Sequence, residues 1–122
     1  MATRSERLGD ILANLRTSSP DIIGAAIISI DGFVIASVLP ADREEDVLSA
    51  MAAAMLGIGE RIAHELLHSE MRQLFVKADT GFVVLNAAGR EAILVSLLSA
   101  KAKLGLVFLD TGRAATAVAA VL

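Results

Sequence analysis

The sequence contains no cysteine, no tryptophan and no tyrosine. Without cysteine the chain has no disulfide bond, no thiol nucleophile and no zinc–thiolate site, which favours a cytoplasmic protein. The four aromatic residues are all phenylalanine, and the net charge is −3. A nucleic-acid-binding protein normally has a basic face or aromatic side chains on which bases stack. We therefore expect no nucleic-acid partner.

Uncharged runs of membrane-spanning length are also missing. Val47–Gly59 has no charged residue, but it falls well short of the ~18 residues that a membrane span needs. The N-terminal segment, MATRSERLGD, lacks the apolar core of a signal peptide. These absences predict a cytoplasmic protein without membrane insertion.

Apolar side chains, by contrast, are abundant. Of the 122 residues, 55% belong to the AVILMFWYC set and 20% are charged. The length suits one domain, spanning residues 1–122, with a core of its own. The apolar fraction exceeds what a monomer of this size needs.

The first third of the chain predicts a helix followed by a hairpin. A Thr-x-x-Glu capping box begins at Thr3, and the apolar stripe after it predicts a helix over residues 4–16. Two β-type runs, residues 22–30 and 33–38, are joined by Asp31-Gly32, which is typical of a hairpin with a type I′ turn. Neither run alternates cleanly between apolar and polar residues, so we expect both faces of these strands to be covered.

The middle of the chain predicts one long helix over residues 43–68, with Asp42 and Glu45 as a cap. Apolar residues occupy two neighbouring faces of this helix. The first face holds Val47, Met51, Ala54, Met55, Ile58 and Ile62, and the second holds Leu48, Ala52, Leu56, Ala63 and Leu67. A helix that is apolar over most of its circumference must be buried on more than one side, and the sheet of so small a domain covers only one.

The last part predicts three strands, over residues 70–78, 82–87 and 91–98, and a final helix over residues 102–121. Polar residues Arg72, Gln73 and Lys77 make the first of these an edge strand or a strand that meets a partner. The element order is therefore α-β-β-α-β-β-β-α, an α+β fold. Short turns make neighbouring strands antiparallel. The simplest packing places the two terminal helices on one face of the sheet and the long middle helix on the other.

Two stretches of this sequence resemble the roadblock (dynein light-chain) family. Gly24–Ser37 (GAAIISIDGFVIAS) is similar to the first hairpin of that family, and Lys103–Leu106 (KLGL) to the start of its last helix. The resemblance covers nearly the whole chain and implies a roadblock/profilin-like fold with a five-stranded antiparallel sheet. It also implies a homodimer, or a higher homo-oligomer, in which the middle helices pair and the strands after them join edge to edge.

The resemblance further implies a function without catalysis. Bacterial and archaeal members commonly work beside a small Ras-like GTPase, which they activate or recruit. Other members are light chains or scaffolds in larger assemblies. We therefore expect a dimeric regulatory partner or scaffold for such a GTPase, with no catalytic residue and no cofactor in this chain. The alternative is a structural, light-chain-like adaptor or a partner of a sensor kinase.

The predicted contact residues fall on the middle helix and on the strand after it. The expected dimer interface comprises Met51, Ala52, Met55, Leu56, Ile58, Gly59, Ala63, Arg72, Leu74 and Val76. Polar residues near the end of the helix are expected to form either a solvated rim or a partner contact. They are Glu60, Arg61, His64, Glu65 and His68.

The stretch His64-Glu65-Leu66-Leu67-His68 fits the pattern H-E-x-x-H, in which two helical histidines bind zinc and the glutamate activates water. A catalytic zinc needs a third protein ligand, and the chain has only two histidines. Glu91 could supply that ligand only if its strand approached this end of the helix. The alternatives are thus a zinc hydrolase, a metal ion bound adventitiously by the two histidines, and a solvated helix end.

Two further features bear on nucleotide chemistry. Gly57-Ile58-Gly59 lacks the third glycine of a dinucleotide-binding motif, and it indicates the close approach of two helices, the alternative being glycines that the helix merely tolerates. No G-x-x-x-x-G-K-[ST] sequence is present, so the chain is not itself a P-loop GTPase. Arg90, in a predicted turn, has the placement of a finger that stabilises charge in a GTPase. The alternatives are a solvated side chain, or stimulation through the GTPase's own switch segments.

Overall fold

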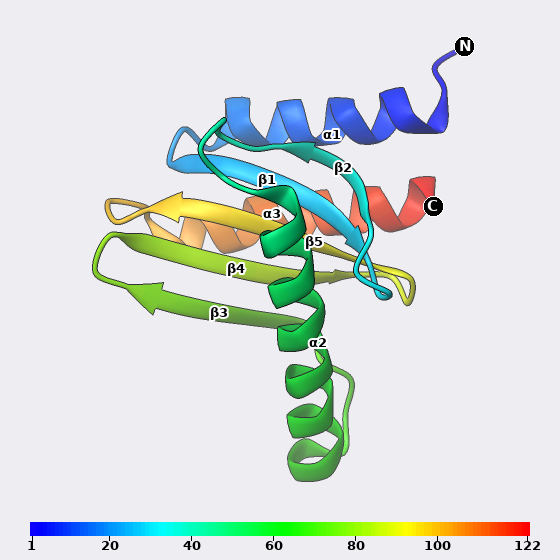
Figure 1. Cartoon of the computed structure of the whole chain (residues 1–122), viewed down its shortest axis with the longest axis vertical. Coiled ribbons are helices and arrows are strands. Elements are labelled where there is room, and N and C mark those ends of the chain that lie inside the picture. Colours follow the sequence, from blue (N-terminus) through cyan, green and yellow to red (C-terminus); the bar gives the residue numbers. More distant parts are fainter.

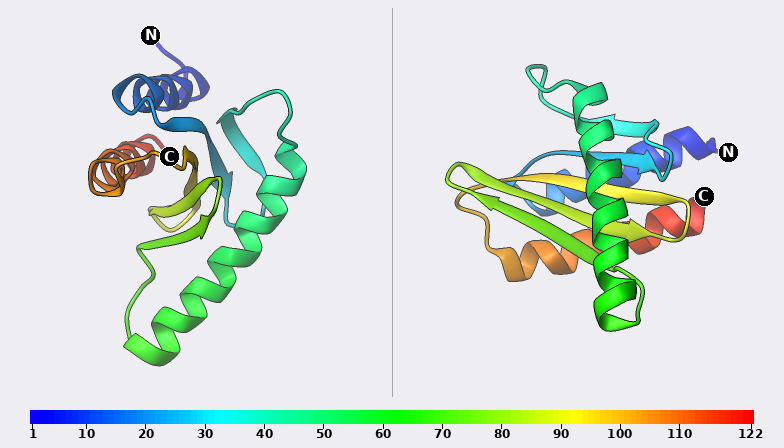
Figure 2. Two further views of the ribbon diagram at one scale, coloured as in Figure 1. Left: turned by 90° about the vertical axis from the view of Figure 1, so that its left-hand side faces the viewer. Right: turned by 60° about the horizontal axis from the view of Figure 1, so that its bottom comes forward.

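The computed structural model describes residues 1–122, and the predicted order of three helices and five strands is confirmed. Their bounds are α1 Arg4–Ser18, β1 Ile22–Ser29, β2 Val34–Val38, α2 Glu45–Leu67, β3 Gln73–Ala78, β4 Gly81–Ala88, β5 Ala92–Ser99 and α3 Leu104–Val121. The strands form one antiparallel sheet in the order β2-β1-β5-β4-β3. Helices α1 and α3 lie on one face of the sheet, and α2 crosses the other (Figure 1, Figure 2).

A separate hydrophobic core fills the space on each face of the sheet. Leu12 of α1 and Val118 of α3 belong to the core beneath these two helices, and Leu56 of α2 belongs to the other. Side chains along a strand point alternately to the two faces, so Leu94 of β5 lies in the first core and Ile93 in the second. Burial on both faces explains why these strands read as continuous apolar runs.

The predicted β1–β2 hairpin is confirmed, but its turn is not type I′. That turn requires positive φ at two central residues, and only Gly32 has it, at 91°. The Gly32 N–H donates to the carbonyl oxygen of Ser29 at 2.9 Å, and the Ser29 N–H donates to the carbonyl oxygen of Phe33 at 2.8 Å. The loop thus has three residues and ends in a left-handed glycine. The Asp-Gly pair correctly predicted where the chain reverses direction. The turn type differs because the loop has three residues instead of two.

Helix α2 begins without the predicted cap. Its N-cap residue is Glu44, whose side chain makes no capping hydrogen bond. Asp42 instead forms an ion pair with Arg43 at 2.7 Å. Glu45 accepts a hydrogen bond from the hydroxyl of Ser37. That bond ties the start of α2 to the edge strand β2.

Helix α2 is longer than the sheet is wide. Its 23 residues, at about 1.5 Å each, give a length of about 34 Å, whereas five strands spaced about 4.8 Å apart span about 19 Å. The helix therefore crosses the sheet from the β2 side and projects beyond β3 at the opposite edge (Figure 1). The prediction that β3 is an edge strand is confirmed.

Helix α3 is long and apolar enough, by length and composition, to cross a membrane: it has 18 residues with a mean hydropathy of 1.4. In this structure it lies against the sheet, and Val107, Ala115 and Val118 are buried in the core. Asp110 and Arg113 interrupt its apolar sequence, so the helix contains no uncharged run of membrane-spanning length.

Candidate dimer and partner interface

The exposed surface of α2 has two flanks of different chemistry. One flank, here called the apolar flank, comprises Val47, Met51, Ile58, Ile62 and Leu66, all of them exposed. The other, the polar flank, carries small or polar side chains at Ala50, Ala53, Gly57, Glu60 and His64. Each residue turns the helix by about 100°, so the two flanks lie on opposite sides of the line that faces the sheet.

The two flanks look toward different ends of the strands. On the polar flank, Ala53 lies near Gly32 of the β1–β2 turn, where an added Cβ would be 3.7 Å from the Ala53 Cβ. Further along this flank, Glu60 and His64 share a hollow with Arg90 of the β4–β5 turn. The apolar flank therefore faces the other half of the sheet, toward the β3–β4 turn, and no helix covers that half on this face (Figure 1).

The residues predicted for a dimer interface divide by burial. Met51, Ile58, Val76 and Arg72 are exposed, and Met55 and Leu74 are half-buried. Ala52, Leu56, Gly59 and Ala63 are buried against the sheet of their own chain. These four belong to the core of the single chain, so an interface on α2 is restricted to the other side of the helix.

The edge strand β3 carries exposed apolar side chains on both faces of the sheet. Phe75 and Val76 are each 46% exposed. The Phe75 ring also packs on Phe108 of α3, with ring centroids 5.6 Å apart. An apolar edge strand with unpaired backbone groups is a template for pairing with another chain.

Gly57 and Gly59 do not have the role predicted for them within this chain. An added Cβ on Gly59 would lie 3.4 Å from side-chain atoms of Met71 and of Leu74, so this glycine brings α2 close to the segment that begins β3. Nothing lies within 4 Å of such a Cβ on Gly57. Within the chain, Gly59 thus allows a close approach of the helix to the segment before β3, and a close approach of two helices stays a prediction.

The polar residues predicted as a rim or partner contact all lie exposed at the C-terminal end of α2 or just after it. Arg61 and Glu65 form an ion pair at 3.5 Å, and an exposed pair of this kind adds little stability. Glu60 and His64 line a hollow of about 490 Å³ together with Arg72 and Arg90. The geometry fits either a solvated rim or a contact surface, and that prediction stays open.

The H-E-x-x-H pattern does not have the geometry of a zinc site. His64 lies on the helix, but His68 is the C-cap residue, with a left-handed φ of 51°. The two imidazoles therefore do not stand one turn apart on a continuous helix, as the motif requires. No group of three potential ligands, Glu91 included, comes together anywhere in the structure. These findings leave the zinc-hydrolase alternative without support.

Arg90 lies exposed in the tight β4–β5 turn, as predicted. Gly89 before it has a φ of 72°, and an added Cβ there would lie 3.4 Å from the Cβ of Ala119, so the turn rests on α3. Neither Arg90 nor Arg72 forms an ion pair. Both guanidinium groups are free to meet an acidic partner surface.

The sequence analysis missed an exposed apolar group at the β1–β2 turn. Phe33 is 71% exposed and Ile30 is 48% exposed. A signal was present, because side chains beside the tip of a hairpin are normally in water. The two residues were instead counted as parts of buried strands.

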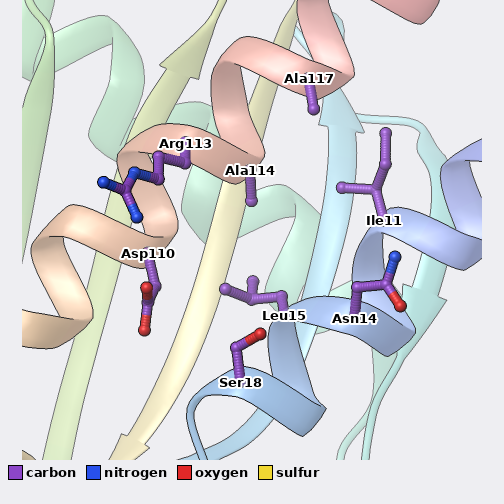
Figure 3. Close-up of a pocket in the computed structure, with 8 residues that line it drawn as sticks. All are labelled: Ile11, Asn14, Leu15, Ser18, Asp110, Arg113, Ala114 and Ala117. Carbon is purple, nitrogen blue, oxygen red and sulfur yellow. The ribbon is translucent and has the colours of Figure 1, made fainter.

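On the opposite face of the molecule, α1 and α3 enclose a shallow seam of about 280 Å³. Ile11 and Leu15 of α1 face Ala114 and Ala117 of α3 across it, and Asp110 lies at its rim (Figure 3). Asn14, Ser18 and Arg113 also line the seam, and the Asp110 carboxylate accepts a hydrogen bond from the hydroxyl of Ser19.

Comparison with known proteins identifies the family. The sequence model of the Roadblock/LC7 domain matches residues 8–97. This chain belongs to the Roadblock/LC7 family. Two uncharacterized proteins of Methanocaldococcus jannaschii are each 38% identical to it over 94 residues, which is 77% of this chain and 82% of each relative. The family match runs from α1 to β5 and stops before α3.

Solved structures show the same fold. Gliding protein MglB of Thermus thermophilus has a TM-score of 0.88 and 22% identity, and the match covers 99% of this chain and 92% of that one. An MglB structure with a tetrameric arrangement has a TM-score of 0.91 and 24% identity over 99% and 91%. Profilin II of Acanthamoeba castellanii has a TM-score of 0.64 and 18% identity over 88% and 95%. The roadblock/profilin-like fold class is therefore confirmed.

Proposed function

We propose that this roadblock protein is a non-enzymatic, cytoplasmic homodimer, or higher homo-oligomer, that regulates or recruits a small Ras-like GTPase. The observation that carries the proposal is the apolar flank of α2 beside the free edge of β3. Family membership supports the GTPase, because bacterial and archaeal roadblock proteins commonly work beside one. The tetrameric arrangement of a similar MglB structure supports self-association.

The apolar flank offers a second copy of the chain enough apolar surface for a stable contact. Ile58, which is 61% exposed, is typical of the flank, and fully burying a side chain of this size contributes about 1.5–3 kcal/mol. Several such residues, with backbone pairing along β3, offset the loss of translational and rotational freedom on association. An interface of about 1,200–2,000 Å² has the standard size for a stable complex.

Pairing through the apolar flanks creates a surface that one copy lacks. The two α2 helices then lie side by side, and their polar ends, with Arg61, His64 and Glu65, stay in water. A GTPase that docks across both helices contacts residues from two copies at once. Loss of the dimer should therefore abolish its binding.

Single-turnover GTP hydrolysis by the candidate GTPase, measured with and without this chain, tests the proposal. We expect Ile58→Glu to give a monomer that no longer changes hydrolysis or binds the GTPase, because it buries a carboxylate in the interface. The matched control is Ala50→Glu, at an exposed position on the polar flank, which should stay dimeric. An Ile58→Glu protein that remains a dimer by light scattering would show that the interface lies elsewhere.

The same assay separates two ways of stimulating hydrolysis. If Arg90 enters the GTPase as a finger, Arg90→Ala should reduce the stimulated rate by about 10³-fold or more while the complex still forms. If the chain acts by reshaping the switch segments of the GTPase, the stimulated rate should survive the substitution. A wild-type dimer that binds the GTPase without changing its rate would indicate recruitment.

A further inference from the structure

The charged side chains of this chain are divided unequally between the two faces of the sheet. Residues 31–70, which include α2, carry eight acidic and two basic side chains, whereas residues 99–122, which include α3, carry one acidic and three basic. Residues 1–21, which include α1, carry three of each sign. Helices α1 and α3 lie on the face opposite α2 (Figure 2). An anionic surface is therefore attracted by the α3 face and repelled by the α2 face.

The three lysines of the sequence are all exposed, and all belong to the α3 face. Lys101 and Lys103 lie in the segment between β5 and α3. Lys77 lies two residues after Phe75 on β3, so these two side chains point to the same face of the sheet. That face is the α3 face, because the Phe75 ring packs on Phe108 of α3.

Strand pairing also places the three lysines at the same end of the sheet. Gly81, the first residue of β4, pairs with Ser99, the last residue of β5. The β3–β4 turn, which follows Lys77 closely, therefore lies beside the segment that carries Lys101 and Lys103 (Figure 1). No lysine forms an ion pair. One corner of the α3 face thus presents three free ammonium groups to solvent.

Exposed leucines adjoin these lysines on the outer side of α3. Leu106 and Leu109 are both exposed, and both belong to the first two turns of the helix. They are three residues apart, so they share one face of the helix, whereas Val107 on the other side is buried in the core. We call this group the lysine–leucine patch; it comprises Lys77, Lys101, Lys103, Leu106 and Leu109.

The charges around the patch are positive in balance. Arg113 is exposed one turn after Leu109. Asp79 lies in the β3–β4 turn, and the carboxylate of Asp110 accepts a hydrogen bond from the hydroxyl of Ser19. The three lysines and Arg113 therefore face two carboxylates, one of which is directed toward the end of α1.

We infer that the lysine–leucine patch docks this protein on an anionic membrane surface, with the two leucines at the headgroup boundary and the lysines among the lipid headgroups. Amphipathic helices bind membranes through this combination of buried apolar side chains and attraction to anionic lipids. Lysine is depleted in protein–protein interfaces, while its flexible stem lets the ammonium reach headgroups beside a buried apolar side chain. The use of lysine thus favours a lipid surface over an acidic protein.

Helix α3 lies along the membrane in this arrangement and does not cross it, because Val107, Ala115 and Val118 stay in the core. The α2 face then points away from the lipid and stays free for a protein partner. If two copies share one sheet, as the family resemblance implies, both patches lie on the same face and bind together, which raises the affinity. The inference goes beyond the proposed function and does not depend on it, since one copy carries a complete patch.

Co-sedimentation of the full chain with lipid vesicles tests the inference. Vesicles of phosphatidylcholine and phosphatidylglycerol in a two-to-one ratio should bind the wild-type protein at least about tenfold more tightly than vesicles of phosphatidylcholine alone. Added salt should weaken this binding because it screens the lysines. Equal binding to both kinds of vesicle, or no binding to the anionic ones, would overturn the inference. Binding of soluble polyglutamate without binding of anionic vesicles would replace the membrane by an acidic protein.

A matched pair of charge reversals tests which face meets the lipid. Lys101→Glu should weaken binding to the anionic vesicles about tenfold, because it replaces an attraction by a repulsion. The control, Arg43→Glu, makes the same change of charge at an exposed residue just before α2 and should change binding by less than about twofold. Equal effects of the two variants would mean that net charge alone governs binding, and would overturn the assigned face.

An apolar pair of variants tests the role of the leucines. Leu106→Gln combined with Leu109→Gln should weaken binding about tenfold and remove the part that resists salt. Phe33→Gln is the control, because Phe33 is also exposed and lies in the β1–β2 turn at the other end of the strands. Circular dichroism should show wild-type folding for both proteins. Undiminished binding by the leucine variant would overturn the inference, whereas a monomeric wild type that binds vesicles would overturn only the proposed dimer.

Discussion

Gly81 and Gly112 show how the space around a backbone position decides the effect of adding one methyl group. An added Cβ on Gly81, at the start of β4, would lie 2.3 Å from the carbonyl oxygen of Leu98, and backbone cannot move aside easily. Gly112 lies inside α3, where such a Cβ would meet nothing within 4 Å. Substitution by alanine should therefore lower the free energy of unfolding at Gly81 and raise it at Gly112.

We predict that Gly81→Ala lowers the free energy of unfolding by about 1–3 kcal/mol, as overpacking does. Gly112→Ala should raise it by up to about 1 kcal/mol, because alanine is the better helix former. Urea denaturation followed by circular dichroism measures both changes. Equal destabilisation by the two variants would mean that the tight contact at Gly81 is not the cause.

At the scale of elements, β3 should show a two-residue pattern of protection against hydrogen exchange. The amides of Leu74 and Val76 bond within the chain and should be protected in any state that keeps β3 folded. The amides of Gln73, Phe75 and Lys77 should exchange slowly in the dimer and fast in the Ile58→Glu monomer. Exchange measured by nuclear magnetic resonance checks this alternation. Uniform protection of all five amides in the monomer would contradict it.

The order of the elements could be predicted because each has a local signal. The capping box at Thr3 marks the start of α1, where the Thr3 hydroxyl accepts a hydrogen bond from the Glu6 N–H at 3.1 Å. Polar residues within an apolar run marked β3 as an edge strand. The pairing of β1 with β5 had no such signal, because the partners are far apart in the sequence.

The faces of α2 could be predicted only in part. Apolar residues surround most of this helix, so the apolar pattern does not show which face packs on the sheet. The sequence analysis therefore assigned Ala52, Leu56, Gly59 and Ala63 to a dimer interface, whereas their own sheet buries them. Ala52, Gly59 and Ala63 are small, which lets the helix lie close to its own chain, and Leu56 fills the core beneath the helix. The prediction that α2 has a second, outward apolar face is confirmed by Met51, Ile58 and Ile62.

At the scale of the whole molecule, stability should depend on protein concentration. Mass action favours the folded dimer over unfolded chains as the concentration rises. We predict that the midpoint of thermal unfolding, Tm, increases by about 2–4 °C for each tenfold rise in concentration. Ile58→Glu should remove this dependence. Differential scanning calorimetry over a hundredfold range measures it, and a constant Tm for the wild type would argue against a dimer.

The central position of β5 also has a consequence for synthesis on the ribosome. β1 and β4 are both paired with β5, which is the last strand to be made. Until residue 99 has left the exit tunnel, the β1–β2 and β3–β4 hairpins have no strand between them, and each exposes an unpaired apolar edge. Such long-range pairing slows folding and leaves nascent chains prone to aggregation. Chaperones that shield emerging chains should therefore matter most for this protein in the interval before β5 appears.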